Sequence, residues 1–330
     1  MTTRFLSVPA LALTLALSAA AEVKIQQGSE KISVEIDGAP FTDFYVSGTD
    51  VTKPFLHPLR TGDGKIVSRV WPMQEKEGEA KDHVHHQGLW FSHGDVNGFD
   101  FWANHPSQKS DKKGTIVLEQ VRAAEGGERM GRIAATFAWK DPSGKVLLRE
   151  NRLMVFRAMG ASRVIDFDIR LTGVETAKFG DTKEGTFAIR LTAPLDGKHT
   201  GKMTNAEGKT GEKQVWGKAS PWVDYAGQLE GETVGIAILD HPSNPKHPTY
   251  WHSRDYGLFA ANIFGEHDFF NDKSRDGSLT LEPGQQWRFR YRVVIHPGDA
   301  EAAHIGRMYE RWSTAPAGGK GGGKKGGKKR

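Results

Sequence analysis

Hydrophobic and polar residues alternate with a period of two along much of this chain. In the first run, Ile32, Val34 and Ile36 are separated by polar residues. Because successive side chains of a β-strand point to opposite faces, such a run predicts a strand with one apolar face. Four later runs repeat the pattern, over residues 133–139, 165–171, 187–191 and 287–295. Turn signals such as Asn97-Gly98 separate the runs. We therefore expect an all-β fold, a large antiparallel β-sandwich.

One helix is predicted, close to the C-terminus. Asp299 can cap a segment in which five residues form a helical apolar stripe: Ala302, Ile305, Met308, Tyr309 and Trp312. Pro316 and the glycines after it end the helix. The chain has no internal repeat and no obvious linker between residues 22 and 315, so we expect one β-sandwich domain over 22–315.

The N-terminus has the features of a signal peptide over residues 1–21. Arg4 precedes an apolar stretch from Phe5 to Leu17, and small residues follow up to Ala21. The apolar stretch of about 13 residues is shorter than the roughly 20 needed to span a bilayer. We therefore expect cleavage near Ala21, a periplasmic or extracellular location, and no membrane span. The chain has no cysteine, which excludes a lipid-anchored mature N-terminus and disulfides.

The basic character of the chain comes from its C-terminal tail. The formal net charge is +5, and six basic residues lie in the Gly/Lys-rich segment 316–330. Without those six residues and Arg4 the net charge becomes −2, so basicity gives no reason to expect a specific nucleic-acid partner. The tail is too polar to form a core, and we expect it to be disordered.

The chemistry of the chain is densest between Asp82 and Trp102. This segment contains four of the thirteen histidines, which are His83, His85, His86 and His93. If it is extended, His83, His85 and His93 share a face with Leu89 and Phe91, and His86 and Trp90 point the other way. His83 and His85 are then candidate ligands for a divalent metal ion, since neutral imidazole is a common ligand.

The segment does not match two more specific metal-binding motifs, the cupin motif and the calcium loop. In cupins a Glu ligand follows the His-x-His pair by a few residues, but here residues 86–89 are His, Gln, Gly and Leu. Asp95 and Asn97 resemble the start of a calcium loop, whose twelfth position should be Glu but is Pro106. We favour a hairpin at Asn97-Gly98. From its rim Asp95 can still reach a substrate hydroxyl.

Candidate site residues also occur in three other segments. The proline-rich stretch 240–264 contains His247, His252 and Arg254, and an ordered loop of this kind is a common place for functional residues. Residues 53–73 contain His57 with two arginines. Arg190 lies between the apolar-face residues of its strand, so it should project from the opposite face.

Four motifs of the chain resemble a bacterial family of unknown function that is labelled PmoA-like, or methane oxygenase-like. They are KPFLHPLRTGDGK, DHVHHQGLWFSHGDVNGFDFW, EGTFAIRL and DHPSNPKHPTYWHSRDYGLFAANIFG. The resemblance covers most of residues 30–312. It implies a galactose mutarotase-like β-supersandwich, a fold in which many proteins act on carbohydrates as epimerases, lyases or glycoside hydrolases.

The leading hypothesis is therefore an exported carbohydrate-active enzyme that uses His/Arg acid–base chemistry on a sugar or sugar-derived molecule. Trp90 and Trp102 would stack on the sugar, and Asp95, Asn97, Arg190 and His247 would bind it. His86 or His93 would exchange a proton. Arg254, helped by His252, would stabilise negative charge, and His57 is a further catalytic candidate. The alternatives are a non-catalytic carbohydrate-binding protein, the metal-dependent oxygenase that the family label implies, and a surface structural protein that acts through its basic tail.

Overall fold

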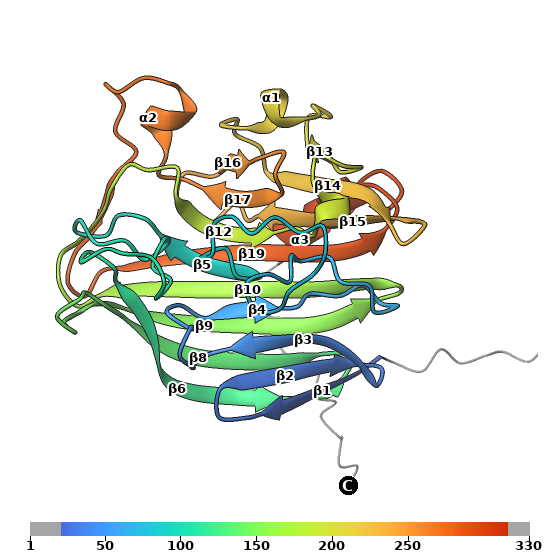
Figure 1. The fold of residues 1–330 in the computed structure, drawn as a ribbon, viewed down its shortest axis with the longest axis horizontal. Coiled ribbons are helices and arrows are strands. Elements are labelled where there is room, and N and C mark those ends of the chain that lie inside the picture. The colour runs from blue at the N-terminus through green and yellow to red at the C-terminus, as the bar shows by residue number, and fades with distance from the viewer. Residues whose placement is uncertain (1–20, 316–330) are drawn as a thin grey trace, which may run out of the picture.

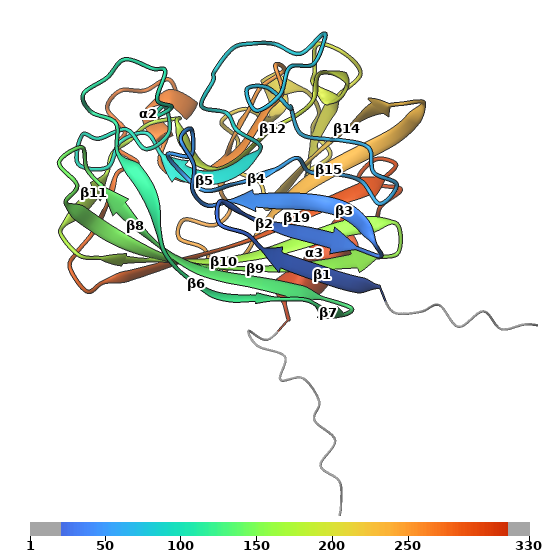
Figure 2. The ribbon, with the colours of Figure 1, turned by 60° about the horizontal axis from the view of Figure 1, so that its bottom comes forward.

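Two large antiparallel β-sheets packed face to face form the body of the protein (Figures 1 and 2). The computed structural model describes residues 21–315. One sheet has nine strands in the order β16-β17-β12-β5-β4-β3-β2-β1-β7, and the other has eight in the order β13-β14-β15-β19-β10-β9-β8-β6. Strands β11 and β18 form a separate pair. The predicted large antiparallel β-sandwich is confirmed.

The strands vary from two to fourteen residues in length. Their bounds are β1 Glu22–Gln27, β2 Lys31–Ile36, β3 Ala39–Tyr45, β4 Phe55–His57, β5 Leu89–His93, β6 Thr115–Glu125, β7 Gly127–Glu128, β8 Gly131–Lys140, β9 Val146–Met159, β10 Ser162–Gly173, β11 Ala177–Phe179, β12 Gly185–Arg190, β13 Lys202–Asn205, β14 Trp222–Leu229, β15 Glu232–Asp240, β16 Tyr250–Ser253, β17 Leu258–Asn262, β18 Leu279–Leu281 and β19 Gln286–Pro297.

The main core lies between the two sheets and is built from the apolar side of the alternating runs. Phe187 of β12 stacks on Tyr291 of β19 with ring centroids 4.4 Å apart, and it meets Phe167 of β10 edge-on at 4.8 Å. These three aromatic side chains are buried. The period-two pattern thus assigns one face of each strand to the core, as the sequence predicts, and leaves the other face for different uses.

The predicted C-terminal helix is present as α3, Ile305–Ser313. Its apolar residues, including Ile305 and Trp312, pack on the outer face of the eight-stranded sheet against Trp222 and Leu239. Asp299 does not cap α3 itself. Its carboxylate accepts a hydrogen bond from the N–H of Ala302 in the turn that precedes the helix.

Two four-residue helices, α1 (Glu212–Val215) and α2 (Glu266–Phe269), and a short 3-10 helix at Ala193–Leu195 lie in connections between strands. Among residues 21–315 no helix is both long and apolar enough to cross a membrane. The predicted signal peptide, apart from its last residue, and the Gly/Lys-rich tail lie outside the described residues.

Candidate functional site

The outer face of the nine-stranded sheet carries the candidate site. Its central row, followed across neighbouring strands, consists of Phe55 (β4), Trp90 (β5), Ala188 (β12), Ala260 (β17) and His252 (β16). Strands in a sheet are spaced about 4.8 Å apart, so the backbones at Trp90 and His252 are roughly 14 Å apart. The two alanines between them are fully buried and pack in one cluster with Trp90, Trp102 and Tyr256. Figure 2 shows the loop between β4 and β5 rising over this side of the sheet.

Buried polar atoms that have no hydrogen-bond partner within residues 21–315 are concentrated on this face. They include the indole N–H groups of Trp90 and Trp102, Nε2 of His86 and His252, and both ring nitrogens of His57. Most buried polar groups in proteins form hydrogen bonds, so such groups call for an explanation. Their concentration on one face is consistent with a site that binds a polar ligand.

Arg69 holds the histidine-rich loop in place. Its side chain is 2 % exposed, and its Nη1 and Nη2 atoms lie 2.7–3.2 Å from five oxygen atoms of Ala80, Asp82, His83 and His86. The carbonyl oxygens of this loop would otherwise be buried without donors. A planar guanidinium can serve several such acceptors at once.

Arg69 and Arg190 share one carboxylate oxygen. Oδ1 of Asp82 is 2.7 Å from Nη1 of Arg69 and 2.9 Å from Nη2 of Arg190. Burial raises the pKa of Asp82, but Arg190, His83 and Arg69 outweigh it, and the pKa is lowered below its usual value. The backbone N–H of Arg69 also donates to the carbonyl of Arg190, so the two arginines are held side by side.

His86 is a neutral hydrogen-bond donor in this arrangement. Burial, followed by the charges of neighbours that include Arg190, holds the pKa of His86 well below its ordinary value. Nη1 of Arg190 lies 3.3 Å from Nδ1 of His86. A guanidinium can only donate, so Nδ1 accepts and the imidazole proton is on Nε2. Nε2 is the atom without a protein partner, so its N–H can be offered to a substrate oxygen.

His83 separates His86 from solvent. Its imidazole lies between two parallel rings, 4.8 Å from His86 and 5.3 Å from Tyr256. The side chain of His83 is 43 % exposed, whereas His86 is 1 % exposed. A ligand can therefore contact His86 from the solvent side only if the His83 side chain moves aside.

His57, His85 and His252, on the same face, are also neutral near pH 7. Burial lowers the pKa of His57 to about 4 and that of His252 to about 3. Burial and then the charge of Lys53 lower the pKa of His85 to about 2. These imidazoles can accept or donate hydrogen bonds without adding positive charge.

Lys53 forms part of the wall behind the two tryptophans. Its buried ammonium donates to the carbonyl of Trp102 at 2.8 Å and to Oδ1 of Asn104 at 2.9 Å. Burial lowers the pKa of Lys53 to about 7. Trp102 meets Trp90 at 4.9 Å, and His86 packs on Trp90 at 5.2 Å.

Glu184, directly before β12, supplies a carboxylate to the same region. Burial raises the pKa of Glu184, and the charge of Glu184 contributes to raising the pKa of Tyr256 to about 12, an effect that is mainly due to burial. Nζ of Lys183 lies 3.7 Å from Oε1 of Glu184. A partly exposed carboxyl with a raised pKa is a candidate group for proton transfer.

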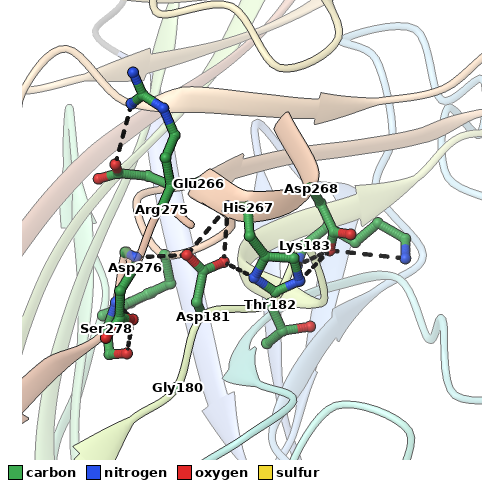
Figure 3. Close-up of polar contacts among 12 residues, drawn as sticks. Gly180, Asp181, Thr182, Lys183, Glu266, His267, Asp268, Arg275, Asp276 and Ser278 are labelled. Atoms are coloured by element: carbon green, nitrogen blue, oxygen red, sulfur yellow. Dashed lines mark hydrogen bonds and ion pairs between the residues drawn. The ribbon is translucent and has the colours of Figure 1, made fainter. Parts of the chain in front are cut away.

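The segment before Glu184 is fixed by α2 and the loop after it (Figure 3). The carboxylate of Asp181 accepts from the backbone N–H of His267 at 3.1 Å and from that of Gly277, and it lies 2.6 Å from Nδ1 of His267. The N–H of Lys183 donates to Asp268 at 3.1 Å. This cluster positions Glu184, and it also positions the carbonyl of Lys183, which lies 2.8 Å from Nδ1 of His252.

Arg254 lies at the more exposed edge of the site. Its guanidinium is 5.7 Å from the ring of Tyr256 and 5.9 Å from that of Trp216. Nε of Arg254 is 3.0 Å from Oε1 of Glu212, in α1. With a side chain that is 33 % exposed, Arg254 can contact a ligand without rearrangement.

The structure brings eight of the predicted site residues to this region. They are His57, His83, His85, His86, Trp90, Trp102, Arg190 and His252, with Arg254 at the edge. The prediction for the loop before β5 needs correction, since His83, His85 and His86 all lie on the Trp90 side. The strand begins only at Leu89, so period-two alternation does not extend back to these histidines.

His93 does not face the site. In β5, Leu89, Phe91 and His93 share one face, as the alternation predicts, and that face points toward the core. The ring of His93 is 4.5 Å from that of Phe264, and its Nε2 is 2.9 Å from the carbonyl of Gly180. Because a proton exchanged with a substrate must reach the ligand side of the sheet, we remove His93 from the catalytic set.

Asp95, Asn97 and His247 have local structural roles instead. The predicted hairpin at Asn97-Gly98 is confirmed, with positive φ at both residues and hydrogen bonds between Val96 and Phe99. Asp95 accepts from the N–H of Gly98, and Asn97 bonds to residues 176 and 178. His247 lies beside α3, with Nδ1 2.7 Å from Asp240 and Nε2 3.4 Å from the hydroxyl of Tyr309.

The proposed metal ligands lie close together but do not complete a metal site. The rings of His83 and His85 are 5.8 Å apart. Among residues 21–315, however, no group of three or more His, Asp or Glu side chains is arranged to hold a metal ion. Nδ1 of His83 instead lies 3.2 Å from the carboxylate of Asp82.

Comparison with known proteins places the chain in a family. It belongs to a family of unknown function, DUF6807, whose model matches residues 31–310. The family description gives no activity and does not carry the PmoA-like label. No curated protein matches the chain.

Several solved structures resemble the fold at very low sequence identity. An α-galactosidase from Lactobacillus brevis is 8 % identical, with a TM-score of 0.40 over 85 % of this chain and 40 % of its own. An α-galactosidase from Geobacillus stearothermophilus is 12 % identical, with a TM-score of 0.35, and the match covers 84 % of this chain and 40 % of that enzyme. A galactose mutarotase related enzyme from Lactobacillus acidophilus is 9 % identical, with a TM-score of 0.33, and the match covers 83 % of this chain and 97 % of that enzyme.

The chain therefore spans about 40 % of the length of these two α-galactosidases. Similarities this low do not transfer an activity to the chain, since one fold supports many functions.

Replacing Arg69 by lysine should destabilise the protein by about 2–3 kcal/mol, because an ammonium cannot serve all five acceptors and leaves buried polar groups unpaired. Urea unfolding measures this change, and hydrogen exchange should become faster in residues 80–86. Arg60→Lys is the matched control, since no side-chain hydrogen bond of Arg60 is found, and it should cost less than about 0.5 kcal/mol. Equal stability of the two variants would contradict the role given to Arg69.

Replacing His83 by alanine should make His86 accessible from solvent. Modification by diethyl pyrocarbonate, followed residue by residue with mass spectrometry, should then be several-fold faster at His86 than in the wild type. His252, which His83 does not contact, is the internal reference and should react at an unchanged rate. An unchanged rate at His86 would mean that another group shields it.

Proposed function

We propose that this protein is a carbohydrate-active enzyme whose site is the outer face of the nine-stranded sheet between Trp90, Tyr256 and Glu184. One observation carries the proposal: buried polar groups without protein partners gather there beside aromatic rings. A sugar presents hydroxyls to polar groups and its C–H faces to aromatic rings. It therefore matches both kinds of surface.

The charged and neutral groups of the site support a proton transfer. The N–H on Nε2 of His86 would donate to a substrate oxygen, and Arg190 behind it would fix the tautomer. The Glu184 carboxylate is the candidate base that accepts a proton. Glu184 would thus take the proton from the substrate, while the neutral imidazole of His86 would stabilise the substrate oxygen by a hydrogen bond and keep its own proton.

Arg254 and His252 would assist at the open side of the same face. Arg254 is suited to binding an oxygen that gains negative charge during the reaction. These parts suit an epimerase, a lyase or a glycoside hydrolase. All three reactions move a proton at a sugar carbon or oxygen.

The second candidate is a non-catalytic carbohydrate-binding protein, favoured by the low pKa values of His57, His85 and His252, whose neutral imidazoles can hydrogen-bond a sugar without exchanging a proton. A binding protein would use the same aromatic rings but would release its ligand unchanged.

We further propose export to the periplasm or extracellular space, on the basis of the signal-peptide features of residues 1–21. Detection of the mature chain starting near residue 22 in the periplasmic or medium fraction tests that proposal.

Single substitutions His86→Ala, Glu184→Gln and Arg190→Ala should each lower turnover of the glycan substrate by about 10²–10⁴-fold, the range typical of acid–base groups and charge-stabilising donors. Product formation is measured by mass spectrometry after incubation with a glycan library. Wild-type turnover should also fall at low pH as Glu184 becomes protonated, and this fall should come at a higher pH than for an ordinary glutamate because the pKa of Glu184 is raised.

Asp95→Asn is the matched control, because it removes a carboxylate from the hairpin outside the site. It should leave turnover within about twofold of the wild type, a difference of less than 0.5 kcal/mol in activation free energy. Binding of glycans by the wild type with no product from any of them would favour the binding protein instead.

A further inference from the structure

A groove beside the proposed site is lined by a second aromatic ring and by charged side chains. It has a volume of about 600 Å³ and is formed by Thr210, Gly211, Glu212, Lys213, Trp216 and Asp255. It belongs to the connection between β13 and β14, which includes α1, and to the residue after Arg254. None of these residues was a candidate from the sequence.

Arg254 joins this groove to the proposed site. Its guanidinium lies between two rings, 5.9 Å from Trp216 on the groove side and 5.7 Å from Tyr256 on the site side. The groove therefore adjoins the site, with Arg254 in contact range of an aromatic ring of each.

The groove has the groups that recognise a sugar. Trp216 offers an indole ring whose N–H is buried without a protein partner, and Phe269 supports that ring edge-on at 5.6 Å. Glu212 and Asp255 provide carboxylates that accept hydrogen bonds from hydroxyls, and Lys213 provides a donor. Aromatic contact combined with hydrogen-bonding side chains is typical of sites for amphipathic ligands such as sugars.

The edge of the groove is held firmly in place. Oε1 of Glu212 is 3.0 Å from Nε of Arg254, and Oε2 accepts a hydrogen bond from the backbone N–H of Asp255 at 2.7 Å. The hydroxyl of Tyr225, buried in the core, donates to the carbonyl of Arg254 at 2.7 Å. These contacts fix the spacing between the two aromatic rings before any ligand arrives, which lowers the ordering cost of binding.

We propose that the Trp216 groove is a second sugar subsite, so that the substrate is an oligosaccharide or glycoside rather than a free monosaccharide. One sugar residue would bind at Tyr256 and the adjoining one at Trp216, with Arg254 contacting both. This inference rests on the proposed function of the neighbouring site and adds the substrate class to it.

The test is the dependence of affinity on sugar chain length. Binding of neutral and acidic gluco-, galacto-, manno- and galacturono-oligosaccharides of one to four residues is measured by calorimetry with the full-length protein. In the wild type, at least one series should bind about tenfold more tightly as the dimer than as the monomer, equivalent to about 1.4 kcal/mol. Trp216→Ala should abolish that gain and leave monosaccharide affinity unchanged. Phe270→Ala, which removes an exposed aromatic residue outside the groove, is the matched control and should keep the gain.

Three outcomes overturn the inference: no series gains affinity with length, Trp216→Ala retains the gain, or Trp216→Ala weakens monosaccharide and oligosaccharide binding equally. Failure of the proposed function is a separate result. Length-dependent binding without any product would support the second subsite and contradict the proposed enzyme activity. Turnover without length dependence would support the enzyme activity and contradict the second subsite.

Discussion

The carboxylate of Asp82, shared between two buried arginines, is the interaction on which the site depends. Arg69 and Arg190 are each 2 % exposed, and two adjacent cations so far from solvent would repel each other without a common anion. Arg69 then orders the loop that carries His83 and His86, while Arg190 fixes the tautomer of His86. One carboxylate therefore connects the loop before β5 with the end of β12.

The two faces of the nine-stranded sheet have different tasks. Its inner face packs on the other sheet through large apolar residues such as Phe91 and Phe187, which makes the scaffold rigid. Its outer face carries Trp90 and Arg190 on the same two strands. A site built on strands of a packed sheet holds its side chains more accurately than one built on loops alone. The loops then add His86 and Glu184 to this platform.

The sequence predicted the strands well because alternation is a local property. It correctly placed Trp90 and Phe91 on opposite faces of β5, and the structure shows that the Phe91 face packs in the core. It failed for His83, because residues before Leu89 are not in a strand and alternation does not apply there. The roles of Glu184 and Tyr256 could not be predicted, since they depend on segments far apart in the chain. His247 was misplaced for the same reason, because its partner Tyr309 comes from α3.

The central claim is that a sugar binds on the outer face of the nine-stranded sheet, with Tyr256 and Trp216 against its rings and Arg190 and Arg254 near its oxygens. A crystal structure of the Glu184→Gln protein, soaked with the oligosaccharide that binds best, tests this most directly. We expect sugar density over the rings of Tyr256 and Trp216, with the His83 side chain moved from its place between Tyr256 and His86. Sugar bound elsewhere, for example on the outer face of the eight-stranded sheet beside α3, would contradict it.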